Sequence, residues 1–224
     1  MTIRRYILFA LIAALFVASC SDDESWVPPY RTDFADLATN AAGDIVSMTL
    51  DNDIKYEGSS FKFQSSNSKE LTQDSLYRAI CVYTIADATA TLYSYTMAFA
   101  PEPITMEQLA DGVVKNDPCT IQSIWRGGDY INASMLVQGK DKAHIVAYMD
   151  EGIESVSGSA GTEYNTLTIR LYHDQNDDME AFTRTIYLSC PLRGYAGKLE
   201  KGRDSIAFVV NQQDKGMTTY KLPY

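Results

Sequence analysis

The chain has 224 residues, of which 46% are hydrophobic and 21% are charged, and its formal net charge at pH 7 is −10. This length is sufficient for one large or two small domains with hydrophobic cores. The acidic balance argues against nucleic acid as a partner, because contacts with phosphate need clusters of Lys and Arg, and the sequence contains no such cluster.

The first segment, residues 1–19, has the composition of a secretory leader. Arg4 and Arg5 form a short basic region, and Tyr6–Val17 is an apolar run without a charge. This run is about a dozen residues long, whereas a membrane-spanning helix needs about 20. The alternative, a buried core helix, would carry a polar face, and this run has none. The sequence therefore predicts a signal peptide that is absent from the mature chain.

The end of the leader, Val17-Ala18-Ser19-Cys20, resembles the bacterial lipobox: an aliphatic residue, two small residues and a cysteine. The thiol would carry a diacylglycerol group, and the small residues would allow a peptidase to cut between Ser19 and Cys20. Two or three acyl chains give a lasting anchor, because each buried methylene contributes about 0.8 kcal/mol. We therefore predict that the membrane is a partner through acyl chains on Cys20. The alternative is a disulfide-forming cysteine after an ordinary signal peptide.

An acidic cluster, Ser21-Asp22-Asp23-Glu24, follows directly after Cys20. It resembles the export signal with which certain anaerobic Gram-negative bacteria send lipoproteins to the outer face of the outer membrane. The sequence thus predicts an outer-membrane lipoprotein that is exposed at the cell surface. The alternatives are a solvated charge run without a signalling role and an anchor that faces the periplasm.

Residues 20–33 are predicted to be a polar tether, and residues 34–110 a small β-barrel. Ile45–Leu50 alternates between apolar and polar residues, Asp51-Asn52-Asp53 is a turn cluster, and Leu76–Ile85 has apolar residues on both faces, as expected of a central strand. Further strand candidates are Ile54–Tyr56, Phe61–Phe63 and Thr91–Phe99. Four or five strands in about seventy residues would make a small barrel.

The second domain, residues 111–224, is predicted to be an antiparallel sandwich of the immunoglobulin-like kind, because about seven short strands are separated by strong turn signals. The strand candidates are Cys119–Trp125, Tyr130–Val137, Ala143–Met149, Tyr164–Tyr172, Phe182–Ser189, Ser205–Val210 and Met217–Leu222. One short helix is expected before this domain, because Thr105–Gln108 has the spacing of a capping box. The fold class is therefore all-β.

The cysteines exclude a scaffold held together by disulfides. With Cys20 lipidated, Cys81, Cys119 and Cys190 remain, so at most one disulfide can form. We expect these three residues to be buried thiols that behave as small hydrophobic side chains.

No residue pattern predicts an enzyme or a cofactor. His144 and His173 are the only histidines, no Gly-x-Ser-x-Gly elbow accompanies them, and neither has a metal-ligand partner at zinc-site spacing. Asp174, Asn176 and Asp178 are a calcium candidate, because they place oxygen ligands at alternate positions. The candidate is weak, because Met179 stands where an EF-hand loop needs glycine. An Asn- and Asp-rich turn explains the same residues.

The fifteen tyrosines suggest sugar-stacking surfaces, although tyrosines at strand alternation more often fill a core. The sequence therefore predicts a non-catalytic protein whose two domains bind a protein or a glycan. A glycan-binding component of a surface nutrient-uptake system is the alternative.

The order of these features resembles the NigD-like lipoproteins, which carry an N-terminal OB-like barrel and a C-terminal β-sandwich. The residues that carry the resemblance are Cys20 in the lipobox, Leu37–Thr39, Ser47–Asp53, Trp125–Asn132, Leu171–Asp174 and Asp204–Phe208. The resemblance implies the fold and the compartment, and it adds a bacteriocin immunity role as a further alternative. It supplies no catalytic or binding residues.

Overall fold

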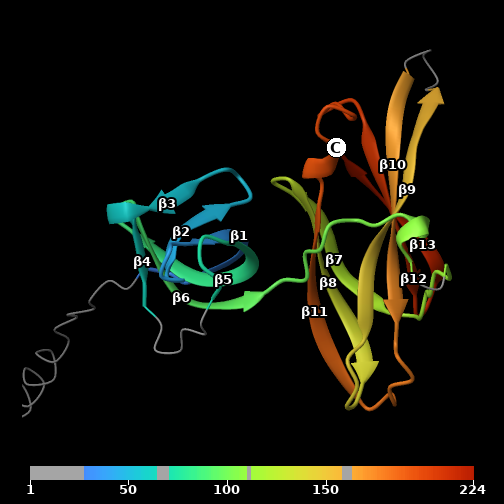
Figure 1. Ribbon diagram of the computed structural model, residues 1–224, viewed down its shortest axis with the longest axis horizontal. Coiled ribbons are helices and arrows are strands. Elements are labelled where there is room, and N and C mark those ends of the chain that lie inside the picture. The colour runs from blue at the N-terminus through green and yellow to red at the C-terminus, as the bar shows by residue number, and fades with distance from the viewer. Residues whose placement is uncertain (1–27, 65–70, 110–111, 158–162) are drawn as a thin grey trace, which may run out of the picture.

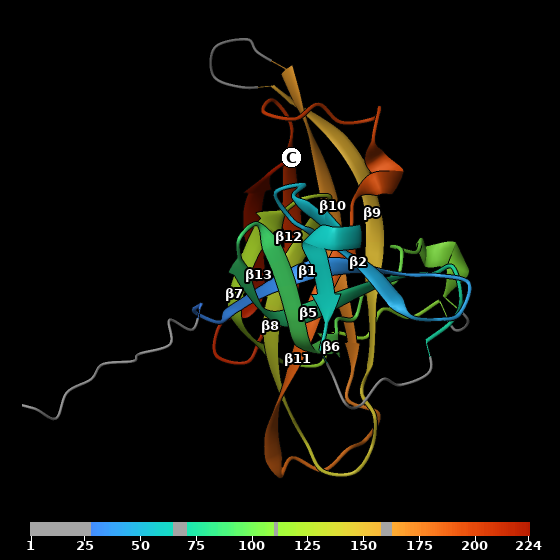
Figure 2. The same cartoon turned by 90° about the vertical axis from the view of Figure 1, so that its left-hand side faces the viewer.

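The computed structural model describes residues 28–64, 71–109, 112–157 and 163–224. The chain forms two all-β domains that lie side by side along the long axis of the molecule (Figure 1). A view along that axis shows the barrel domain in front of the sandwich (Figure 2). The predicted leader, Cys20 and the cluster Ser21–Glu24 lie outside the described residues.

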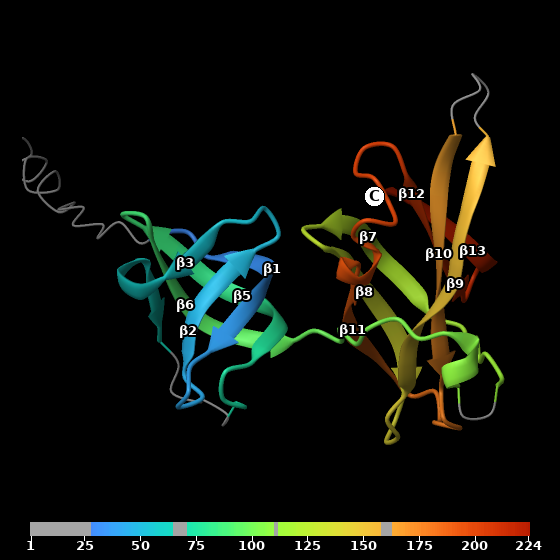
Figure 3. The same ribbon diagram turned by 45° about the horizontal axis from the view of Figure 1, so that its top comes forward.

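The first domain is one six-stranded sheet with the order β3-β2-β1-β5-β6-β4. Its elements are β1 (Arg31–Thr39), β2 (Ile45–Leu50), β3 (Lys55–Glu57), the 3₁₀ helix η1 (Gly58–Ser60), β4 (Phe61–Phe63), β5 (Leu76–Ala86) and β6 (Thr89–Met97). Strand β4 pairs with β6 in parallel and also contacts β2, so the curved sheet is nearly closed (Figure 3).

The alternation of side chains along β1 gives this strand two different faces. Ala35 and Leu37 are fully buried in the barrel core, together with Met48 and Leu92. The other face of β1 is directed toward the sandwich and carries Phe34 and Asp36, which lie opposite Ile80 and Arg78 of β5.

Several tyrosines of the barrel contribute to its core, as expected, whereas Tyr93 packs against Tyr30. The Tyr83 side chain is buried, and Tyr77 and Tyr95 pack against the same core from partly exposed positions.

The second domain packs a four-stranded sheet, β13-β12-β10-β9, on a three-stranded sheet, β11-β8-β7. The strands are β7 (Thr120–Gly127), β8 (Tyr130–Gly139), β9 (Ile145–Ser157), β10 (Glu163–Asp174), β11 (Phe182–Pro191), β12 (Ser205–Gln212) and β13 (Gly216–Pro223), with 3₁₀ helices η2 (Met106–Gln108) and η3 (Arg193–Tyr195). The core includes Tyr148, Ile169 and Phe208, which are almost entirely buried.

The connector between the domains is hydrogen-bonded to both of them. The backbone N–H of Ala98 donates to the carbonyl oxygen of Arg78 in the barrel (2.9 Å), and the N–H of the next residue, Phe99, donates to the carbonyl oxygen of Tyr187 in β11 (2.8 Å). Ile104 then pairs with Met149 of β9. The predicted domain boundary, at residues 110 and 111, lies outside the described residues.

The all-β class is confirmed, and all seven predicted strands of the sandwich are present. One pair in this domain, β10 with β12, is parallel, whereas a fully antiparallel sandwich was predicted. Strand β1 begins at Arg31, inside the predicted tether, and was not among the predicted strands. The predicted helix is the single turn η2, which Thr105 and Gln108 cap reciprocally. Cys81, Cys119 and Cys190 are free and buried, as predicted.

Candidate functional site

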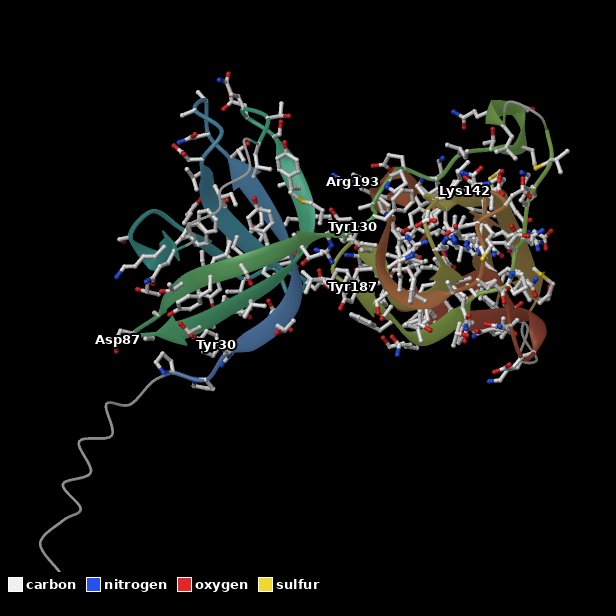
Figure 4. All side chains as sticks on the ribbon, turned by 90° about the horizontal axis from the view of Figure 1, so that it is seen from below. Tyr30, Asp87, Tyr130, Lys142, Tyr187 and Arg193 are labelled. Atoms are coloured by element: carbon white, nitrogen blue, oxygen red, sulfur yellow. The ribbon has the colours of Figure 1, made fainter. Side chains whose placement is uncertain are left out.

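The two domains meet through the outer face of β1 and β5 and the outer face of the β11-β8-β7 sheet. Across this sheet, Trp125, Asn132 and Ser189 lie in one row, and Ser123, Ser134 and Tyr187 lie in the next. Figure 4 shows Tyr130, Tyr187 and Arg193 on the side of the sandwich that faces the barrel. Polar side chains of the barrel face and of the sandwich face therefore meet at the junction of the domains.

Arg78 is the centre of this junction. It lies in β5 of the barrel, its residue exposure is only 7%, and its guanidinium reaches carboxylates of its own domain, Asp36 and Asp51. The same group crosses to the sandwich, where Nε donates to Ser189 Oγ (2.8 Å) and Nη2 donates to Asn132 Oδ1 (3.1 Å). One buried cation thus holds groups from both domains.

The Tyr130 ring covers this cation. The guanidinium carbon of Arg78 lies 3.9 Å from the ring centroid, a distance at which a cation–π interaction stabilises the pair. The Tyr130 hydroxyl donates to the Asp36 carboxylate at 3.1 Å. Burial raises the pKa of the Tyr130 hydroxyl to about 12, and the Asp36 charge acts in the same direction. Burial also raises the pKa of Asp36 above its ordinary value, although Arg78 and Tyr130 act to lower it.

The turn between β7 and β8 is shaped to receive Asp51 of the barrel. Asn132 Nδ2 donates to Asp51 Oδ2 at 2.6 Å. A Cβ atom on Gly127 would collide with both the Asp51 carboxylate and the Asn132 amide, and Gly128 has a positive φ of 52° close to the Asp51 backbone. Glycine is required here because another domain approaches the backbone.

Next to this junction the domain faces separate and leave a cleft of about 510 Å³. This volume is in the range of small-molecule sites. The barrel contributes Arg31, Thr32, Asp33, Phe34, Leu50, Asp51, Asn52, Ile80 and Tyr83, and the sandwich contributes Ser123, Trp125, Ser134 and Tyr187. We take this interdomain cleft as the candidate binding site.

Trp125 is the most accessible aromatic side chain of the cleft, with an exposed fraction of 38%. It packs edge-to-face on Phe34 of the barrel, with 5.4 Å between ring centroids. Phe34 packs in turn against Tyr187, at 6.4 Å. The buried Phe34 ring therefore supports Trp125 from one side, while part of the indole remains open to a ligand.

Comparison with known proteins identifies the family of the chain. The model of the NigD-like C-terminal beta sandwich domain matches residues 101–224, which is more than half of the chain. The chain belongs to the NigD-like family. The family resemblance of the sequence is thereby confirmed.

Three solved structures are similar to this NigD-like chain, each with a TM-score of 0.64. Each comparison covers 88% of the present chain. A NigD-like immunity protein from Bacteroides caccae is 22% identical and covered over 93% of its chain. A protein of unknown function from Bacteroides vulgatus is 16% identical and covered over 91%, and a toxin-related protein from Parabacteroides distasonis is 17% identical and covered over 93%. At these identities the similarity shows the fold alone. No curated protein matches the chain.

The two histidines of the NigD-like chain do not line the cleft and contact each other, which the sequence did not predict. His173 Nδ1 donates to the carbonyl oxygen of Asp117 (2.9 Å), and His173 Nε2 shares a hydrogen bond with His144 Nδ1 (2.9 Å). His144 Nε2 is buried without a hydrogen-bond partner and lies 3.6 Å from the Asp178 carboxylate. Their 29-residue separation in the sequence gave no signal of this contact.

The pKa of His144 is lowered below its ordinary value of 6.5, mainly by burial and also by His173 and Arg184, while Asp178 acts in the opposite direction. The unfolded chain therefore binds a proton at about pH 6.5, before the folded chain does. We expect the free energy of unfolding to fall as the pH decreases below about 6.5. Above that pH, the stabilisation that neutral His144 provides should be fully present.

Thermal unfolding midpoints of the wild type and His144→Gln, measured from pH 7.5 to 5, test this prediction. The difference between the two curves isolates the histidine from other titrating groups. We expect the wild type to lose more stability than the variant over this range. Parallel curves would show that His144 titrates alike in the folded and unfolded states.

The acidic loop that includes Asp174, Asn176 and Asp178 is a hydrogen-bonded turn in the structure. The Asp178 carboxylate accepts the backbone N–H groups of Lys140, Asp141, Lys142 and Met179 and pairs with Arg184. Although burial acts to raise the pKa of Asp178, these backbone donors hold it far below its ordinary value.

The other carboxylate of the calcium candidate, Asp174, pairs with Lys115 at 2.6 Å and also accepts the Asn176 backbone N–H. Within the described ranges, no group of three or more His, Cys, Asp or Glu side chains is arranged to hold a metal ion. Hydrogen bonds and ion pairs thus engage the carboxylates of Asp174 and Asp178.

Proposed function

We propose that this NigD-like chain is a non-catalytic lipoprotein, anchored to the bacterial envelope through Cys20, that binds a ligand in its interdomain cleft. The observation that carries the binding role is the cleft itself, where the partly open Trp125 lies among hydroxyl groups from both domains and the amide of Asn52. A site built at the interface of two domains, with a few polar groups around apolar side chains, has the usual composition of a ligand pocket.

The anchoring role is supported by the sequence of the leader and the lipobox. In the part of the chain that the structure describes, no helix is long and apolar enough to cross a bilayer. The cluster Ser21–Glu24 favours display at the cell surface. A non-catalytic role is favoured because His144 and His173 form a hydrogen bond with each other. These are the residues that a hydrolytic site would most readily use.

Replacing Cys20 with serine is expected to move the chain from the membrane fraction to the soluble fraction, because the acyl chains have no other attachment. Mass spectrometry should find lipid on the wild-type cysteine. Ser19→Ala is the matched control, because it keeps a small residue at the cleavage site and should remain membrane-bound. An uncut leader, or a Cys20 sulfur free of lipid in the wild type, would exclude this anchor. Protease added to intact cells distinguishes surface display, in which the chain is cut, from an anchor that faces the periplasm.

The binding role is tested with the mature chain, residues 20–224, immobilised and exposed to glycan and peptide fractions of the envelope. Material retained by the wild type and by Phe182→Ala, but lost with Trp125→Ala, supports binding in the cleft. Phe182 is a suitable control, because it is also an exposed aromatic residue of the sandwich, with an exposed fraction of 66%, and does not line the cleft. Equal retention by both variants would contradict the proposal.

An immunity role against a bacteriocin is a second candidate, because a similar structure is described as a NigD-like immunity protein. It predicts that deletion of the gene sensitises the producing cell to a bacteriocin. Unchanged sensitivity would leave the cleft-binding proposal as the remaining role.

A further inference from the structure

We infer that the interdomain cleft binds a short neutral oligosaccharide. This inference rests on the proposed function, because it names the ligand class of that cleft. It combines three properties of the lining: an open aromatic side chain, a row of hydroxyl groups, and the balance of its charges.

The aromatic component is Trp125. The face of an aromatic ring carries partial negative charge, which attracts the weakly positive C–H groups on one face of a sugar ring. The indole is held in place, because Phe34 packs on it at 5.4 Å and Phe34 is itself only 6% exposed. A rigid aromatic side chain loses little conformational entropy when a ligand packs on it.

The polar component is a row of hydroxyl groups across three strands. Ser123 of β7 lies opposite Ser134 of β8, and Ser134 lies opposite Tyr187 of β11. The Ser134 hydroxyl donates to Gln122 Oε1 at 3.1 Å, which leaves its oxygen able to accept. Thr32 adds a hydroxyl from the barrel side. Hydroxyl groups both donate and accept hydrogen bonds, as do the hydroxyl groups of a sugar, so the two surfaces are complementary.

The charges of the lining favour a neutral ligand. Among the charged lining residues, Arg31 is basic, whereas Asp33 and Asp51 are acidic. Asp33 accepts a hydrogen bond from the Tyr83 hydroxyl at 2.9 Å, and Asp51 pairs with Arg78. A uronic acid, sulfate or phosphate group would therefore meet like charge without a cluster of cations to bind it.

The edge of strand β7, next to the cleft, is poorly suited to binding an extended peptide. Strand β7 is the last strand of its sheet, so its outer edge is where a peptide would add by backbone pairing. A bulge between Ile121 and Ser123 interrupts the register of this strand beside the cleft. Bulges at sheet edges hinder the pairing of a further strand. The glycan is therefore the better-matched class.

The binding test uses the intrinsic fluorescence of Trp125. The chain has two tryptophans, so Trp26→Phe leaves Trp125 as the sole reporter. The mature chain, in a zwitterionic detergent without sugar head groups, is titrated with neutral trisaccharides of glucose, mannose and N-acetylglucosamine. Oligogalacturonates and unmodified hexapeptides are titrated in parallel. We expect a saturable change in emission with at least one neutral trisaccharide and none with the other two classes.

Calorimetry with the variants then places the ligand in the cleft. We expect Trp125→Ala to weaken binding of the active trisaccharide about tenfold or more, as for a buried aromatic anchor. Ser123→Val, which keeps the fold of the strand but removes a hydroxyl, should also weaken it, and Phe182→Ala should not. Unfolding midpoints establish that each variant is folded.

The outcomes separate this inference from the proposed function. Saturable binding of only the acidic sugar or only the peptide overturns the neutral-glycan inference and leaves a cleft-binding protein. The same holds if the neutral set gives no signal while envelope material is still lost with Trp125→Ala. If no class binds and retention of envelope material is independent of Trp125, the proposed function fails as well.

Discussion

Replacing Arg78 with methionine is expected to lower the free energy of unfolding by about 3–5 kcal/mol, as when one partner is removed from a buried ion pair. The variant would leave the carboxylates of Asp36 and Asp51 at the domain junction without their cation. It would also remove the donors to Asn132 and Ser189, which are both fully buried. Methionine fills a similar volume, so the loss measures polar contacts more than packing.

Urea unfolding monitored by far-UV circular dichroism measures this loss. Arg170→Met is the matched control, because Arg170 is also a strand arginine paired with a carboxylate, Glu151, but both side chains are partly exposed. The control should lose no more than about 1 kcal/mol. Arg78→Lys should fall between the two, because it keeps the charge and loses the planar fork of donors. Equal losses for Arg78→Met and Arg170→Met would show that the junction contributes little to stability.

Replacing Gly127 with alanine is expected to destabilise the protein by about 1–3 kcal/mol, the usual cost of overpacking a close contact. The new methyl group would overlap the Asp51 carboxylate and the Asn132 side-chain amide, so the turn and the barrel would have to move apart. Because the residue lies between the domains, the variant should also weaken whatever binds in the cleft.

Gly194→Ala is the control for this prediction, because nothing lies within 4 Å of its added Cβ atom. We expect its unfolding midpoint to stay close to that of the wild type. Gly127→Ala measured in an Asp51→Ala background tests the cause directly, because the collision partner is then shorter. If the cost of Gly127→Ala is the same in both backgrounds, the clash with Asp51 is not its source.

The sandwich could be predicted strand by strand because its signals are local. Glycine-rich and Asp-rich turns separate its strands, and the apolar residues of each strand alternate within a few positions. Strand β1 was missed for the opposite reason. Its outward face carries Asp36, whose partners Arg78 and Tyr130 belong to a later strand and to the other domain. A local pattern does not show that such a polar face is buried.

The candidate site could not be predicted for the same reason. Arg78 lies in a strand that was correctly predicted to be central, but its partners Asn132 and Ser189 are 54 and 111 residues away. Two of the segments that carry the family resemblance, Ser47–Asp53 and Trp125–Asn132, meet at this junction through Asp51, Gly127 and Asn132. An arginine within an otherwise apolar strand was the one local sign that a buried polar contact existed here.

The connector described above restricts how the two domains can move. Because Ala98 bonds to the barrel and Phe99 to the sandwich, translation of one domain away from the other would break backbone hydrogen bonds on both sides. Arg78 is part of both attachments: its carbonyl oxygen accepts from Ala98, and its guanidinium binds Ser189. The hydrogen bonds from Asn132 to Asp51 and from Tyr130 to Asp36 join the same two domains at further points. A ligand would therefore enter a cleft whose two walls are already held apart, and binding there would not require the domains to separate.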